Sequence, residues 1–189
     1  MASAEAPERV IHRFASLLDT AGIPYMLTGS FASGFHGAPR ATQDIDIVIS
    51  PNFASLKRFL NALAEDQYYV SQEAALGAYG RESLFNVIDF ASGWKLDLIC
   101  RKSRPFSVCE FERRAPQQLA GMTVYVTSAE DVVLSKLEWG KLSQSERQLE
   151  DAAGIVRIQG GQLDVEYIRD WVERLGLRDG WKKVEAMAG

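Results

Sequence analysis

Two carboxylates spaced two residues apart, Asp44 and Asp46, are the side chains in this sequence best placed to do chemistry. Their segment, Asp-Ile-Asp-Ile-Val-Ile, predicts a strand over residues 44–49. Because side chains alternate between the two faces of a strand, both carboxylates project from one face, while Ile45 and Ile47 project from the other. Two like charges this close are costly unless a cation neutralises them, and the usual cation is a divalent metal.

Two further features accompany this pair. The residues Gly29-Ser30 break a short apolar strand predicted over residues 25–28, and thirteen residues separate them from Asp44. A third carboxylate, Asp97, lies between two leucines in a later predicted strand. Since those leucines must face the core, Asp97 faces the opposite side of its sheet. The sequence therefore places three carboxylates and a glycine turn on strands of one predicted sheet.

The surrounding elements alternate between helices and strands up to residue 127. Apolar spacing and turn residues predict helices over 8–20, 31–35 and 51–64, strands over 25–28, 44–49, 68–70, 83–90 and 95–100, and a hairpin over 117–127. Residues 73–81, which contain two glycines, are predicted to form a loop, and residues 106–113 form a short mixed segment. A turn over residues 91–94 joins two of the strands.

Helical patterns dominate from Ser128 onward. Ser128 is a natural helix N-cap, and Asp131 at the third helical position completes a capping pair. Helices are predicted from 128 through 139 and over 146–158, 164–175 and 179–187. The predicted fold class is therefore α/β (α+β). An N-terminal mixed β-sheet core flanked by helices occupies residues 1–127, and a C-terminal helical region packed on that core occupies residues 128–189.

Composition limits the function classes. The chain has 189 residues, of which 47% are hydrophobic and 24% are charged, as expected for one globular domain with a small helical appendage. The formal net charge of −4 argues against a generally basic nucleic-acid binder. No apolar run is long enough to span a bilayer, and the N-terminus is not a signal peptide, so we expect a cytoplasmic protein without a membrane partner. Cys100 and Cys109 have no CxxC spacing and are expected to be reduced thiols.

The three carboxylates and the Gly-Ser turn resemble the motif of the polymerase-beta-like nucleotidyltransferase superfamily. That motif consists of an apolar residue, Gly, then Gly or Ser, a gap of about a dozen residues, Asp-x-Asp, and a third acidic residue on a later strand. Residues 40–44, Arg-Ala-Thr-Gln-Asp, are similar to the form in the branch of abortive-infection type nucleotidyltransferase toxins and small relatives. Residues 130–137 and 147–152 resemble that branch's helical motifs, and residues after Gly160 match no known motif.

The resemblance implies a Mg²⁺-dependent enzyme that moves NMP from an NTP, such as ATP, onto an acceptor hydroxyl and releases pyrophosphate. Asp44, Asp46 and Asp97 would be the catalytic carboxylates and would hold two Mg²⁺ ions, which Mn²⁺ could replace. The triphosphate would be bound by four residues: Gly29, Ser30, Arg40 and Lys136. Glycine allows the backbone to approach a phosphate closely, and amides at a helix start bind anions.

The acceptor stays open at this point. The toxin branch implies tRNA or a protein as acceptor, with an antitoxin-like partner. The aminoglycoside and lincosamide nucleotidyltransferases share the Asp-x-Asp core, so a small antibiotic is an alternative acceptor. A catalytically idle nucleotide-binding or partner-binding module of the same fold is a further alternative. The last thirty residues could cap the core, close over the acceptor or form a homodimer.

Several of the same residues also have structural interpretations. Lys136 could extend from an apolar helix to the surface. Arg147 and Asp151, four residues apart, could form only an ion pair on a helix surface. The basic residues at 101, 102, 104, 113 and 114 could contact RNA phosphates or simply be solvated.

Overall fold

A computed structural model describes residues 5–37, 39 and 42–189 of the chain. The contacts between residues divide the chain into two compact units. The first unit comprises Met1–Thr28 and Thr42–Val126, and the second comprises Gly29–Ala41 and Thr127–Gly189. By these contacts, residues 29–37 group with the C-terminal helices.

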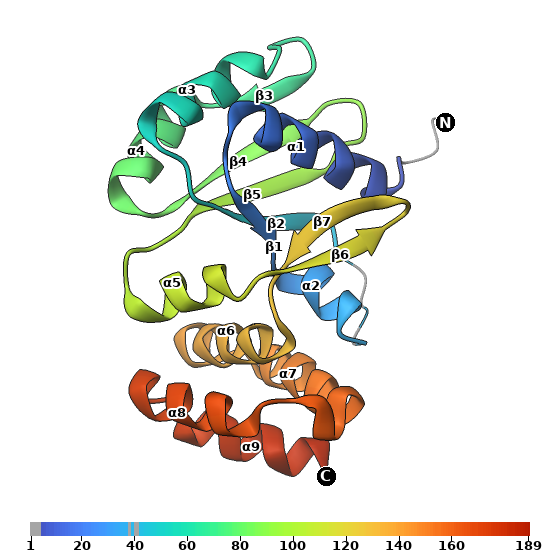
Figure 1. Ribbon diagram of the computed structural model, residues 1–189, viewed down its shortest axis with the longest axis vertical. Helices are drawn as coiled ribbons and strands as arrows, with labels where there is room; N and C mark the ends of the chain where they lie inside the picture. The colour runs from blue at the N-terminus through green and yellow to red at the C-terminus, as the bar shows by residue number, and fades with distance from the viewer. Residues whose placement is uncertain (1–4, 38, 40–41) are drawn as a thin grey trace. The chain divides into compact units, whose positions relative to one another are not determined.

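The first unit is built on a seven-stranded mixed sheet in the order β3-β4-β5-β2-β1-β7-β6 (Figure 1). The central pair β2–β5 and the pair β1–β7 are parallel, and the other neighbours are antiparallel. The strands are β1 (Tyr25–Leu27), β2 (Asp44–Ile49), β3 (Tyr68–Val70), β4 (Leu84–Asp89), β5 (Lys95–Cys100), β6 (Ala115–Leu119) and β7 (Met122–Val126). The mixed sheet predicted from the sequence is confirmed.

One face of this sheet forms the main core of the unit. The helices are α1 (Pro7–Ala21), α3 (Phe53–Ala62), α4 (Gln72–Arg81) and α5 (Pro105–Glu112), and α1 and α3 lie together on one side of the sheet (Figure 1). Ile45, Ile47 and Ile49 are at most 1% exposed. Asp44 and Asp46, which alternate with the first two of them along the strand, are only half-buried. The alternation predicted for this strand is confirmed, and it separates an apolar face from an acidic one.

Helix α5 covers one end of the acidic face. Its Phe111 packs in a cluster with Met26 of β1 and Val48 of β2, and Ile99 of β5 packs against the same cluster. Val48 and Ile99 share a face with the carboxylates, because each lies two residues beyond one of them in its strand. The acidic face therefore has an apolar end under α5 and a polar end around Asp44.

The second unit is helical. It contains α2 (Gly29–Phe35), α6 (Ala129–Ser143), α7 (Glu146–Gln159), the short 3₁₀ helix η1 (Gly160–Gln162), α8 (Val165–Leu175) and α9 (Arg178–Ala188) (Figure 1). The predicted helical character of the C-terminal half is confirmed. The Ser128 cap is also confirmed, since its hydroxyl accepts a hydrogen bond from the Asp131 amide at 3.2 Å.

The loop predicted over residues 73–81 is wrong, because these residues form helix α4. The Ser71 hydroxyl caps the helix by accepting from the Ala74 amide at 3.1 Å, and Ala75 and Ala78 are buried. Gly77 and Gly80 weaken the helical signal by roughly 1 kcal/mol each relative to alanine. Capping and burial outweigh that cost. Within the described residues, no helix is both long and apolar enough to cross a membrane.

Candidate active site

The register of β2 and β5 brings four charged side chains together on the acidic face. Asp46 pairs with Asp97, and Asp44 pairs with Lys95, in neighbouring parallel strands. Neighbouring strands lie about 4.8 Å apart, and side chains on one face repeat about every 6.6 Å along a strand. The four residues therefore lie at the corners of a small rectangle, with three carboxylates and one ammonium. We call these four residues the acidic quartet.

Lys95 joins two of the carboxylates. Its Nζ lies 3.1 Å from Oδ1 of Asp44 and 3.3 Å from Oδ2 of Asp97. The hydrogen bond to Asp44, with the added attraction of Asp97, raises the pKa of Lys95 above its ordinary value. The side chains of Lys95, Asp44 and Asp97 are 40%, 46% and 18% exposed. The bridge is thus open to solvent at Asp44 and more enclosed at Asp97.

Asn86 of β4 holds the other oxygen of Asp97. The two residues pair across the β4–β5 hairpin, and the Asn86 amide Nδ2 donates a hydrogen bond to Oδ1 of Asp97. Both oxygens of Asp97 are therefore engaged, one by Asn86 and the other by Lys95. The sequence reasoning missed both partners. Asn86 could have been found because it is the single asparagine in the strand predicted over residues 83–90, which the predicted hairpin pairs with the strand of Asp97. Lys95 could have been found because it lies two residues before Asp97 and therefore on the same face of that strand.

The donors of the quartet suit a hard divalent cation, because Mg²⁺ prefers carboxylate oxygens. Even so, nowhere in the described part of the chain do three or more Asp, Glu, His or Cys side chains converge to hold a metal ion. The chemistry of Asp44, Asp46 and Asp97 fits a metal. The observed arrangement instead places the Lys95 ammonium between Asp44 and Asp97.

The backbone conformation at the predicted turn explains why a glycine is found there. Gly29 has φ +63°, in the left-handed region that favours glycine, and it begins α2. The Ser33 hydroxyl donates to the Gly29 carbonyl at 2.9 Å, and Ser30 is 7% exposed. In the first unit, the Thr28 amide donates to the Asp46 carbonyl at 3.0 Å, which fixes the strand end just before the turn. Arg40, the other predicted phosphate ligand near this turn, lies outside the described residues.

Lys136 of α6 belongs to the second unit and is buried there. It is 4% exposed, and its Nζ lies 2.8 Å from Oδ2 of Asp151 and 3.4 Å from Oε1 of Gln148 on α7. The interpretation that Lys136 extends to the surface is therefore wrong. Asp151 joins α7 to α6 through this ion pair. Whether Lys136 also binds a triphosphate stays a prediction.

A buried carboxylate of this unit, Asp131, was interpreted from the sequence only as part of a helix cap. Asp131 is fully buried, and it accepts hydrogen bonds from the Ser128 hydroxyl at 2.7 Å and from the Tyr167 hydroxyl of α8 at 2.6 Å. A buried carboxylate is costly unless its oxygens are hydrogen-bonded. Asp131 therefore connects the start of α6 to α8.

The basic residues around α5 are partly held by aromatic rings. The guanidinium of Arg114 lies 4.2 Å from the centroid of Phe111, and that of Arg104 lies 5.4 Å from the centroid of Phe106. Arg101 lies 5.9 Å from the Phe111 centroid and donates to the Ser50 hydroxyl at 3.2 Å. Through these contacts the three arginines pack on the aromatic rings of α5. Their binding to RNA stays a hypothesis.

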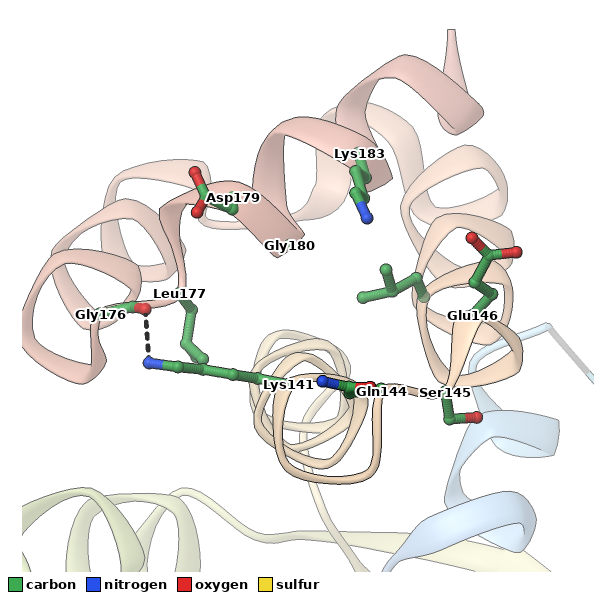
Figure 2. Close-up of a pocket in the computed structure, with 11 residues that line it drawn as sticks. Lys141, Gln144, Ser145, Glu146, Gly176, Leu177, Asp179, Gly180 and Lys183 are labelled. Atoms are coloured by element: carbon green, nitrogen blue, oxygen red, sulfur yellow. Dashed lines mark hydrogen bonds between the residues drawn. The ribbon is translucent and has the colours of Figure 1, made fainter.

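The second unit also contains a cavity of about 380 Å³, lined by residues from α6, α7 and α9, from the α6–α7 turn and from the α8–α9 turn. Figure 2 shows Lys183 pointing into the cavity and Lys141 extending along it to the Gly176 carbonyl, to which it donates at 3.0 Å. Glu146 and Asp179 also line it, so charges of both signs are present. No residue predicted to form the active site lines this cavity.

The fold can be compared with solved structures. An antigenic nucleotidyltransferase-like protein from Paracoccidioides brasiliensis superposes with a TM-score of 0.57 at 16% identity, covering 95% of this chain and 92% of that one. The ANT(2")-Ia structure in complex with adenylyl-2"-tobramycin gives 0.58 at 14% identity, covering 93% of this chain and 98% of that one. The chain has the nucleotidyltransferase fold.

A third structure of this fold is the lincosamide antibiotic adenylyltransferase LnuA bound to lincomycin. It gives a TM-score of 0.55 at 13% identity and covers 80% of this chain and 97% of that one. No protein-family model matches the chain, and no curated protein matches its sequence. In these comparisons, the likeness to nucleotidyltransferases is therefore detected in the three-dimensional fold and not in the sequence. The predicted α/β class is confirmed.

Proposed function

We propose that this protein is a divalent-metal-dependent nucleotidyltransferase that moves NMP from an NTP onto an acceptor hydroxyl. The observation that carries the proposal is the pairing of Asp46 with Asp97, beside Asp44, on one face of two parallel strands. This arrangement occurs in a chain with the nucleotidyltransferase fold. Three carboxylates on one face repel one another, which favours binding of a cation there.

Asp44, Asp46 and Asp97 would hold the metal, for which Mg²⁺ is the expected ion and Mn²⁺ a substitute. Such an ion neutralises charge that develops on the phosphoryl oxygens and aligns the attacking and leaving oxygens. Asp97 also accepts the proton of the acceptor hydroxyl, and Asn86 fixes the orientation of its carboxylate. The exposed position of Asp44 leaves its carboxylate accessible to an incoming triphosphate complex.

The triphosphate is assigned to the residues predicted from the sequence: Gly29, Ser30, Arg40 and Lys136. Gly29 begins α2 without a Cβ, and the amides that follow it are donors of the kind that bind phosphate. Lys136 is held by Asp151 in the second unit. In this proposal the ion pair holds the Lys136 ammonium in a fixed position. A phosphate oxygen of the triphosphate would contact the ammonium in addition to the Asp151 carboxylate and the Gln148 amide oxygen.

Two acceptor classes remain candidates. The first is tRNA or a protein, in a toxin–antitoxin setting with an antitoxin-like partner. The second is a small hydroxylated antibiotic, which is favoured by the likeness to ANT(2")-Ia and LnuA over almost their whole lengths. A catalytically idle module of the same fold is the outcome if no acceptor is labelled.

The test is transfer of label from each α-³²P NTP in the presence of Mg²⁺. Acceptors are total tRNA, the protein itself, and separate panels of aminoglycosides and lincosamides. The wild-type protein should label one of them, and Asp46→Asn should abolish labelling. The matched control is Asp66→Asn, the same chemical change at an exposed turn of the first unit, which should label like the wild type.

Three results bear on the proposal differently. Labelling that requires Asp46 supports it, and the labelled acceptor decides between the two classes. Labelling that survives Asp46→Asn would place the chemistry elsewhere and overturn the proposed site. If the wild-type protein labels no acceptor with any NTP, the idle-module alternative replaces the enzyme.

A further inference from the structure

Lys95 occupies an unusual position for a surface lysine. In the acidic quartet it is the corner beside Asp44 across the strands and beside Asp97 along its own strand. Its ammonium contacts one oxygen of each carboxylate, at 3.1 and 3.3 Å. A cation ligated by both carboxylates would be drawn to those same oxygens, since the other oxygen of Asp97 already accepts from Asn86.

We propose that Lys95 is a built-in counter-cation that competes with the metal for Asp44 and Asp97. This inference rests on the proposed function, because it takes the acidic quartet as the metal site. In the metal-free protein, Lys95 neutralises part of the repulsion among the three carboxylates. When the metal–triphosphate complex binds, the ammonium leaves both carboxylates, and its flexible four-carbon side chain allows that movement without a change in the backbone.

The energetics of the quartet suit such an exchange. An ion pair that is partly exposed to water contributes little stability, so it can be broken at small cost. Lys95 is 40% exposed, and its shorter contact is to Asp44, the more exposed carboxylate. A divalent ion interacts more strongly with carboxylates than an ammonium does, because its charge is double and it binds oxygens at shorter distance. The lysine therefore lowers metal affinity without preventing metal binding.

The competition predicts opposite effects of Lys95→Met in the two states. The metal-free variant, measured in EDTA, should melt at a lower temperature than the wild type because the carboxylates lose their counter-cation. With Mn²⁺, its dissociation constant measured by calorimetry should fall about tenfold, which corresponds to the loss of two partly exposed ion pairs. Lys95→Arg retains the charge and should bind Mn²⁺ within about threefold of the wild type.

Two controls separate this effect from others. Lys57→Met removes an exposed lysine of α3, on the opposite side of the sheet, and should leave Mn²⁺ affinity unchanged. Asp46→Asn should weaken Mn²⁺ binding and thereby reports on the metal site itself. If Lys95→Met fails to fold, Lys95→Gln, which removes the charge and keeps a hydrogen-bond donor, takes its place.

The outcomes distinguish the two proposals. Tighter Mn²⁺ binding by Lys95→Met, with weaker binding by Asp46→Asn, supports the counter-cation. Equal binding by Lys95→Met and the wild type, with weaker binding by Asp46→Asn, overturns the role of Lys95 and leaves the proposed function intact. Mn²⁺ binding that is unaffected by Asp46→Asn, or absent from the wild type, overturns the metal site and the counter-cation together.

Discussion

Two lysines of this chain pair with aspartates in very different surroundings. Lys95 of the first unit is 40% exposed and bridges Asp44 and Asp97 on an open sheet face. Lys136 of the second unit is 4% exposed and pairs with Asp151 between two helices. Their distances are similar, at 3.1 and 2.8 Å for the shortest contacts. The difference lies in the exposure of the ammonium groups, because water reaches the Lys95 ammonium readily and the Lys136 ammonium hardly at all.

That difference separates an exchangeable pair from a structural one. Removing one partner of a buried ion pair leaves an uncompensated charge in a medium that cannot solvate it. Removing one partner of an exposed pair leaves a charge that water solvates readily. We therefore expect the Lys136 pair to stabilise the second unit strongly, and the Lys95 pair to be replaced easily by a ligand. Four substitutions test this comparison, in order of decreasing effect on stability.

The largest effect is expected for Lys136→Met. It leaves the Asp151 carboxylate, whose side chain is 16% exposed, without the ammonium, and should lower the free energy of unfolding by about 3 kcal/mol. Urea unfolding followed by circular dichroism measures it. Adding Asp151→Leu to this variant should recover most of the loss, because the carboxylate is then removed together with the ammonium. A loss below about 1 kcal/mol for Lys136→Met would remove the distinction between the two lysines.

The double variant also tests the proposed contact of Lys136 with the triphosphate. Because it should be folded, any loss of nucleotide affinity reflects the missing ammonium rather than unfolding. We expect weaker NTP binding by calorimetry than in the wild type. Equal NTP affinity in the two proteins would show that Lys136 is structural only.

A smaller effect is expected for Tyr167→Phe. The Tyr167 hydroxyl donates to the fully buried Asp131, so its removal deprives a buried carboxylate oxygen of a donor. The cost should be about 2 kcal/mol in the same urea experiment. The matched control is Tyr69→Phe, the same chemical change at an exposed tyrosine of β3. It should change stability by less than about 0.5 kcal/mol, and an equal loss in the two variants would remove the role of the Asp131 contact.

Lys95→Met should lower the stability of the metal-free protein by about 1.4 kcal/mol at most, because both of its ion pairs are partly exposed. Thermal unfolding in EDTA measures this change. A loss as large as that of Lys136→Met would mean that Lys95 is structural, and the contrast between the lysines would fail.

The smallest effect on stability is expected for Asn86→Ala. Asn86 is exposed, so the loss should stay within about 0.5 kcal/mol. Its effect on the site should be larger, because residues that orient a metal-binding carboxylate commonly contribute about tenfold or more to affinity or activity. Weaker Mn²⁺ binding with unchanged stability is the expected result. Unchanged binding would mean that Asn86 does not orient Asp97 in the loaded site.

Local patterns in the sequence were sufficient to predict much of the fold. The bounds predicted for β2, β3 and β5 are those observed, because the apolar residues of each strand and the turn residues that flank it determine it locally. Helix α4 was missed because Gly77 and Gly80 obscured a helix that depends on the Ser71 cap and on buried alanines. Burial is a tertiary property, which no local pattern contains.

The candidate site was predictable in its carboxylates but not in their partners. Asp44, Asp46 and Asp97 followed from the period of two and from the resemblance to a known motif. The contact of Lys95 with Asp44 depends on β2 and β5 being parallel neighbours, although 51 positions separate the two residues. The pairing of Lys136 with Asp151 likewise depends on how α6 packs against α7. Such contacts require the three-dimensional arrangement.

The most direct test of the account is thermal unfolding with Mg²⁺ and a non-hydrolysable NTP. A ligand at about 100 times its dissociation constant stabilises the folded state by about 2.7 kcal/mol, which should raise the melting temperature by about 5 °C or more. The account predicts this rise for the wild type and for Asp66→Asn, and its loss in Asp46→Asn. No rise in the wild type at millimolar ligand, or an equal rise in Asp46→Asn, would contradict a nucleotide site built on the acidic face.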